Sequence, residues 1–276
     1  AIGSQTGGSV LRPASFTGIL GFKPTFGTIS RSGMSPISQR LDHPGVYANC
    51  VEDIDLVASV ILSYDSKDLD MIQNYQYKNT LNLNKSLKFG FVRGPVWNFG
   101  DEDMKNGIEE FVRNSQLDIQ ELDLGKDFDD AAKAHEIIMN GSIAYSLMNY
   151  YQTDKSNLHP FTVERIEAGI PVSASDYVSA IEQAKKMEQI LKQFFKKYDA
   201  IITPAAPGQA PRDLMNTGNA IFNGYWTMMG VPAISLPFLK GKDDLPIGIQ
   251  FIANWSEDLK LLEICKYILE KEKLAN

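Results

Sequence analysis

The chain has 276 residues, of which 43% are apolar and 22% are charged, and its net charge is −7. This length and apolar content suffice for one large domain or two small ones with a sizeable core. The acidic balance argues against nucleic acid or an anionic membrane as a partner, because both require a basic footprint. No apolar run in the sequence approaches the roughly 18–20 residues of a membrane-spanning helix.

The first 48 residues are rich in Gly, Ser, Thr and Pro but are interspersed with apolar residues, which indicates a tightly turned, packed segment. A helix is predicted over residues 50–63, with Glu52 and Asp53 in the first turn, where the helix dipole favours acidic side chains.

Strand, helix and strand patterns follow in turn over residues 86–94, 101–115 and 117–124. This order predicts a parallel α/β arrangement. Residues 129–151 have a helical pattern that we expect to be interrupted at Asn140-Gly141.

The last hundred residues continue the α/β pattern. A helix over residues 173–198 opens with a Ser-x-x-Asp sequence close to a capping box. Three strands and a closing amphipathic helix complete the chain: 199–207, 231–238, 245–253 and 258–272. No repeat or linker interrupts the sequence, so we predict a single α/β domain over residues 1–276.

Two cysteines, Cys50 and Cys265, are too few for a disulfide framework and have no C-x-x-C spacing. A reducing compartment is therefore the default, and we expect a cytoplasmic protein with no metal and no cofactor. The sequence leaves open whether the protein forms a homodimer.

The stretch Thr6-Gly7-Gly8-Ser9 has the composition of an acyl-transfer loop. Two glycines without Cβ can turn successive amides toward one point, and acyl transfer needs such N–H groups for the developing oxyanion. The Ser9 hydroxyl would lie beside them, but it needs a neighbouring base to become a nucleophile. An alternative is that Ser9 is only the N-cap of the following helix.

Other serine or phosphate motifs are absent from the sequence. The glycines are not followed by Lys and Ser or Thr, so this is not a P-loop, and no G-x-S-x-G elbow occurs. With no such elbow to serve, the three histidines His43, His135 and His159 are expected to be structural.

The opening stretch, "GSQTGGSVLRPASFTGILGFKPTFGTISRSGMSPISQRLDHPG", resembles the second half of the amidase signature. The stretches "YDAIITPAAPGQAP" and "FNGYWTMMGVPAISLPFLKGKDDLPIGIQFIA" resemble the closing strands of that family. The resemblance spans the whole chain and is weakest from about residue 65 to 190. Within the family, the chain is most similar to small-amide amidases of the malonamidase type.

The resemblance implies a mixed, mostly parallel sheet flanked by helices, and a Ser–cis-Ser–Lys triad. Ser9 matches the nucleophile that forms the acyl-enzyme, and Thr6, Gly7, Gly8 and the Ser9 amide match the oxyanion hole. The bridging Ser and the base Lys precede the nucleophile in this family, and only eight residues precede Ser9 here. We therefore expect a C-terminal portion, truncated at its N-terminus and inactive alone. Lys23 is expected to be structural or ion-paired.

Two positions depart from the family pattern. Gln5 stands where many members have Asp, and Arg12 lies one residue later than the usual Arg. In a helix, Arg12 would share a face with Ser9, so its guanidinium could bind the carboxylate of a short dicarboxylic acid monoamide. The alternative is an internal salt bridge to an acidic residue.

The resemblance implies an amide C–N hydrolase that acts on a small amide. One alternative is the amidase subunit of a tRNA-dependent amidotransferase, which usually carries Asp at the position of Gln5. Another is a non-catalytic, truncated paralogue that only binds ligands or partners.

Overall fold

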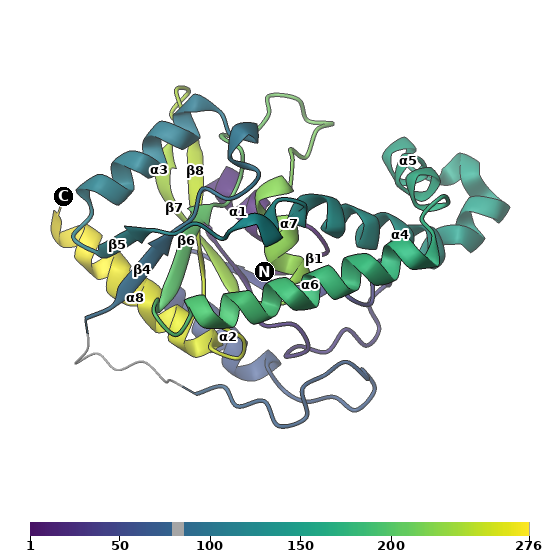
Figure 1. The fold of residues 1–276 in the computed structure, drawn as a ribbon, viewed down its shortest axis with the longest axis horizontal. Helices are drawn as coiled ribbons and strands as arrows, with labels where there is room; N and C mark the ends of the chain where they lie inside the picture. Colours follow the sequence, from purple (N-terminus) through teal and green to yellow (C-terminus); the bar gives the residue numbers. More distant parts are fainter. Residues whose placement is uncertain (79–85, 276) are drawn as a thin grey trace.

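The computed structural model describes residues 1–78 and 86–275 (Figure 1). Its strands form one eight-stranded sheet in the order β1-β3-β2-β7-β8-β6-β4-β5. The strands are β1 Ile2–Gln5, β2 Leu20–Lys23, β3 His43–Ala48, β4 Lys88–Phe91, β5 Asp118–Glu121, β6 Ala200–Pro204, β7 Ala233–Lys240 and β8 Pro246–Ile252.

The helices have the following bounds: α1 Leu11–Thr17, α2 Val51–Ile61, α3 Glu102–Asn114, α4 Ala131–Asp154, α5 Pro160–Gly169, α6 Ala174–Phe194, α7 Ile221–Met228 and α8 Asp258–Ala275. Short 3-10 turns cover Trp97–Phe99, Lys126–Phe128 and Lys155–Asn157. Over the described ranges, no helix combines the length and apolarity needed to cross a bilayer.

The expected α/β fold with a mixed sheet flanked by helices is confirmed, but its parallel part is smaller than expected. Among the described strands, only β4 with β5 and β4 with β6 pair in parallel, and the other pairs are antiparallel. The reason lies in the connections. A parallel pair needs a crossover such as α3 between β4 and β5, whereas β7 and β8 are joined by a short turn over residues 241–245.

Helix α4 runs without a break through Asn140 and Gly141, so the expected interruption there is wrong. The glycine serves packing instead. A Cβ at Gly141 would lie 3.1 Å from Tyr177 Cδ2 and 3.3 Å from Val172 Cγ1, so its absence lets α6 approach α4 closely. Figure 1 shows α4, α5 and α6 extending to one side, away from β4 and β5.

The short helix α7 lies in the interior, and each residue from Phe222 to Met228 is buried. It contacts α4, while α1 packs on β7 and β8. These contacts bring α1, α4 and α7 around the loop that joins β1 to α1.

Candidate active site

The loop between β1 and α1 carries Ser9, and its seat is defined by the burial of its neighbours. Gly7 and Gly8 are buried, whereas Ser9 is exposed. The cap residue of α1 is Val10, with no side-chain cap bond, so the alternative role of Ser9 as helix N-cap is wrong. Ser9 therefore presents its hydroxyl from an exposed position between a buried glycine pair and the start of a helix.

Gln5 does the capping that Ser9 does not. Its Oε1 accepts hydrogen bonds from Val10 N at 2.8 Å and Leu11 N at 3.0 Å. Its Nε2 donates to Thr227 Oγ1 of α7 at 2.8 Å. A neutral amide can accept from the helix start and donate to α7 at once, which an ionised carboxylate cannot do. This accounts for Gln at a position where the family pattern often has Asp.

Four consecutive carbonyl groups of the loop each accept a hydrogen bond. The pairs are Thr6 O with His135 Nε2 at 3.1 Å, Gly7 O with Thr227 Oγ1 at 2.6 Å, Gly8 O with Arg12 N at 2.9 Å, and Ser9 O with Tyr47 OH at 2.6 Å. The donors come from α4, α7, α1 and β3, so the loop is held from several sides.

These bonds orient the amide groups of the loop. A trans peptide is planar, so each carbonyl points opposite to the N–H of the next residue. The Val10 N–H is accepted by Gln5, as described above. Across residues 1–78 and 86–275, the N–H groups of Gly7, Gly8 and Ser9 have no hydrogen-bond acceptor. Three successive N–H groups beside an exposed serine are therefore available to an anion.

Thr6 contributes its side chain to a different contact. Thr6 Oγ1 donates to Asp42 Oδ1 at 2.6 Å, and Asp42 Oδ2 accepts from Ile37 N and Ser38 N, both at 2.8 Å. This carboxylate fixes the first residue of the loop to the segment before β3.

Gly8 is the glycine that packing requires. A Cβ at Gly8 would lie 2.3 Å from Asn223 Oδ1 and 3.0 Å from Ala220 Cβ, so α7 rests directly on its backbone. A Cβ at Gly7 would make only ordinary contacts, at 3.6 Å from both Ala220 Cβ and His135 Cε1.

Arg12 lies beside the loop that precedes α7, where a Cβ at Gly218 would be 3.7 Å from Arg12 Cδ. Its Nε is buried without a hydrogen-bond partner among the described residues. Burial lowers the pKa of Arg12, and the Tyr47 hydroxyl opposes this. Within the same residues Arg12 makes no ion pair with an acid, so the internal salt bridge finds no support there.

Lys23 has a structural environment. It is fully buried, and its Nζ donates to Val231 O at 2.7 Å and Pro24 O at 3.1 Å. Burial lowers the pKa of Lys23 to about 7, while the charge of Asp258 acts in the opposite direction. The ammonium is committed to backbone carbonyls that join β2 to the start of β7.

The three histidines differ in their surroundings. His43 is buried with Nδ1 2.6 Å from Leu41 O, and exposed His159 caps α5 by accepting from Phe161 N at 3.2 Å. His135 instead contacts the Ser9 loop, a position that sequence reasoning missed. No base was found for Ser9: in the part of the chain that the structure describes, its hydroxyl has no hydrogen bond to a basic side chain.

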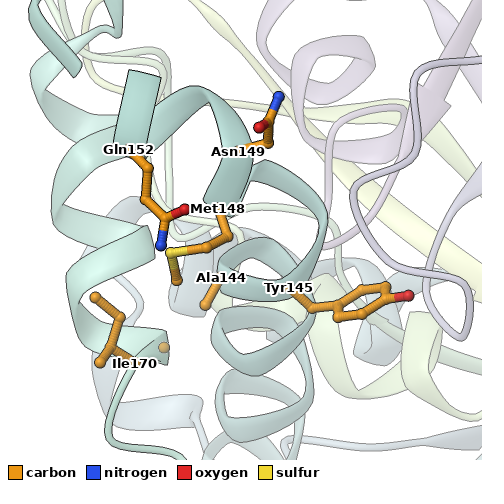
Figure 2. A pocket seen from close by; sticks show the side chains of 7 residues that line it. Ala144, Tyr145, Met148, Asn149, Gln152 and Ile170 are labelled. Carbon is orange, nitrogen blue, oxygen red and sulfur yellow. The ribbon is translucent and has the colours of Figure 1, made fainter. Parts of the chain in front are cut away.

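A pocket of about 590 Å³ lies elsewhere, between α4 and α5 (Figure 2). It is lined by Ala144, Tyr145, Met148 and Ile170, among others, and includes no residue of the Ser9 loop. Nor do the described residues contain a group of three His, Cys, Asp or Glu side chains able to hold a metal ion. The chemistry of the site therefore has to be sought at the loop around Ser9.

Solved structures with the same fold identify the class of protein. A crystal structure of an amidase superposes with a TM-score of 0.83 at 21% identity and covers 98% of this chain and 62% of its own. A variant of the Kluyveromyces lactis allophanate hydrolase superposes with a TM-score of 0.84 at 20% identity, covering 98% of this chain and 46% of its own. The fold is that of the amidase-signature enzymes.

The sequence comparisons agree with the fold. The family model described as Amidase matches residues 1–262, and the chain belongs to this family. One relative, from the glutamyl-tRNA(Gln) amidotransferase of Agathobacter rectalis, is 30% identical over 99% of this chain and 61% of its own length. The subunit of the same name from Aliarcobacter butzleri is 30% identical over 95% and 65%. The chain thus spans less than two thirds of the length of these relatives.

Proposed function

We propose that this chain carries the nucleophile of an amide C–N hydrolase, and that Ser9 is that nucleophile. The observation that supports this most directly is the loop geometry. An exposed serine stands beside three N–H groups that lack acceptors within the described residues, while the loop carbonyls are tied down on the other side. An oxyanion site requires this combination of free donors and fixed peptide planes.

In the proposed reaction, Ser9 Oγ attacks the amide carbonyl carbon and its proton passes to the bridging serine and base lysine. The carbonyl π electrons move to oxygen, and the resulting oxyanion is stabilised by the N–H groups of Gly7, Gly8 and Ser9. Collapse breaks the C–N bond, and the leaving nitrogen takes a proton from the bridging serine. Water then attacks the ester, which releases the acid and restores Ser9. We propose that the bridging serine and the lysine come from sequence outside these 276 residues.

Arg12 supports a class of substrate. It follows Ser9 by three residues, and no described acid neutralises it. A guanidinium binds carboxylates through paired hydrogen bonds. We therefore propose a short dicarboxylic acid monoamide, with its free carboxylate at Arg12 and its amide at Ser9. The cysteine content supports a cytoplasmic location for this activity.

A second candidate is the amidase subunit of a tRNA-dependent amidotransferase. The curated relatives cited above are named as parts of such an amidotransferase and cover nearly the whole of this chain. Such a protein would release ammonia efficiently only with its partner proteins, whereas an independent hydrolase would act alone. Ammonia release by the purified protein, with and without a partner fraction, distinguishes the two.

The test is a comparison of Ser9→Ala with Ser4→Ala in the chain extended by its upstream coding sequence. Ser4 is an exposed serine of β1 and provides a matched control. We expect Ser4→Ala to keep wild-type release of ammonia from the monoamide, and Ser9→Ala to lower kcat by about 10⁴-fold or more. Full activity in Ser9→Ala would refute the assignment. An extended chain that is inactive on every amide would favour the non-catalytic paralogue.

A further inference from the structure

A buried histidine of α4 lies against the Ser9 loop. His135 Nε2 is 3.1 Å from Thr6 O, and a Cβ at Gly7 would lie 3.6 Å from its Cε1. On the other side, a Cβ at Gly224 of α7 would lie 2.7 Å from His135 Nδ1. The imidazole therefore fills the space between the loop and α7, and only a glycine at position 224 leaves room for it.

The contact fixes the tautomer of the ring. A carbonyl oxygen only accepts hydrogen bonds, so Nε2 is the nitrogen that carries the proton. Burial lowers the pKa of His135, which keeps the ring neutral with a single N–H group. That one donor is committed to Thr6 O.

The Thr6–Gly7 peptide depends on this donor more than its neighbours depend on theirs. The Gly8 carbonyl is held by the first turn of α1, which is part of the same local segment. The Thr6 carbonyl is held by a side chain from a distant helix, and the next residue, Gly7, has no Cβ to restrict its dihedral angles. Removal of the Nε2 donor would therefore free this peptide plane to rotate.

We propose that His135 is a positioning residue for the oxyanion site. By holding the Thr6 carbonyl on one side, it turns the Gly7 N–H to the opposite side, toward the substrate carbonyl. The inference rests on the proposed function of Ser9. His135 itself touches neither the substrate nor the nucleophile's hydroxyl. Its effect is on the direction of one N–H group, so it bears on the oxyanion and not on the ground-state amide.

The test uses three substitutions in the chain extended by its upstream coding sequence, assayed on a short dicarboxylic acid monoamide. His135→Gln keeps an N–H donor near the position of Nε2, whereas His135→Asn has the same amide one bond shorter and cannot reach Thr6 O. His135→Met removes the donor and retains bulk. Loss of one oxyanion donor costs about 10²–10³-fold in kcat, so a misaligned donor in His135→Asn and His135→Met should cost about 10- to 100-fold. KM should be unchanged, and His135→Gln should retain most of the wild-type kcat.

His159→Met is the matched control, because it removes a histidine from the neighbouring α5 cap and should leave kcat unchanged. Thermal melts establish that each variant folds, and the Gln and Asn pair decides the matter if the Met variant does not. Wild-type kcat in His135→Asn would overturn the inference, as would equal losses in His135→Asn and His135→Gln. If Ser9→Ala keeps its activity, the proposed function itself fails. If Ser9→Ala is inactive while His135→Asn is unaffected, only the role of His135 fails.

Discussion

Replacement of Gly8 by alanine tests how closely α7 rests on the Ser9 loop. The new Cβ would lie 2.3 Å from Asn223 Oδ1 and 2.9 Å from Asn223 Cγ, both closer than real Cβ contacts. Asn223 is fully buried, and its Nδ2 donates to Ala205 O at 2.9 Å and to Gln250 Oε1 at 3.2 Å. The amide therefore cannot move aside without losing these two bonds.

The expected cost follows from these contacts. Overpacking a well-packed interior costs about 1–3 kcal/mol, and each buried hydrogen bond that is broken adds about 0.5–1.5 kcal/mol. We expect Gly8→Ala to lower the free energy of unfolding by about 2–4 kcal/mol if part of the overlap is relieved by movement of Asn223. Gly7→Ala is the control, because its Cβ would find contacts at 3.6 Å, and it should cost less than about 1 kcal/mol.

Denaturant unfolding of the two variants measures this difference. The same measurement in an Asn223→Ala background gives the coupling between the two positions. Gly8→Ala should cost about 1 kcal/mol less when the Asn223 side chain is absent, because the overlap disappears with it. Equal costs for Gly7→Ala and Gly8→Ala, or a cost for Gly8→Ala that is the same in both backgrounds, would refute this account of the loop.

Three further predictions concern the residues around the loop. Thr227→Val removes the donor to Gly7 O and the acceptor for Gln5 Nε2, so kcat should fall about 10-fold or more, whereas Thr227→Ser should keep it; equal kcat values would contradict this. Arg12→Met should raise KM for a monoamide with a free carboxylate and spare a neutral amide of equal length; an equal loss with a lower Tm would make Arg12 structural. Because burial lowers the pKa of Lys23 from 10.5 to about 7, the unfolded chain binds a proton that the folded chain lacks between these pH values. Stability relative to Lys23→Met should therefore rise with pH across that window and be constant below it, as unfolding curves at several pH values would test.

Much of the fold could be predicted from periodicity. The patterns over residues 50–63, 101–115 and 173–198 correspond to α2, α3 and α6, in which apolar residues recur at helical spacing. The first 48 residues gave no such signal. Their three strands have four to six residues each and contain glycine and proline, and they are ordered by pairing with one another and with β7. Pairing at long range leaves little trace in a local pattern.

The candidate site divides in the same way. Ser9 and its two glycines could be predicted from the motif, since they are consecutive in the sequence. His135 and Thr227 could not, because they meet the loop across 129 and 220 residues of chain, through side chains that are unremarkable within their own helices. A buried histidine and a buried threonine in a helix are ordinary core residues until their acceptors are known.

This division has a physical reason. Glycines let the loop backbone approach α7 and turn its amides together, but the same freedom leaves the direction of each peptide plane undetermined locally. The directions are set by donors on α4, α7 and β3, whose positions depend on the packing of the whole fold. The motif thus specifies which N–H groups can serve an oxyanion, and the tertiary structure specifies where they point. A substitution far from Ser9 in the sequence, at His135 or Thr227, is therefore expected to act on the same step as one within the loop.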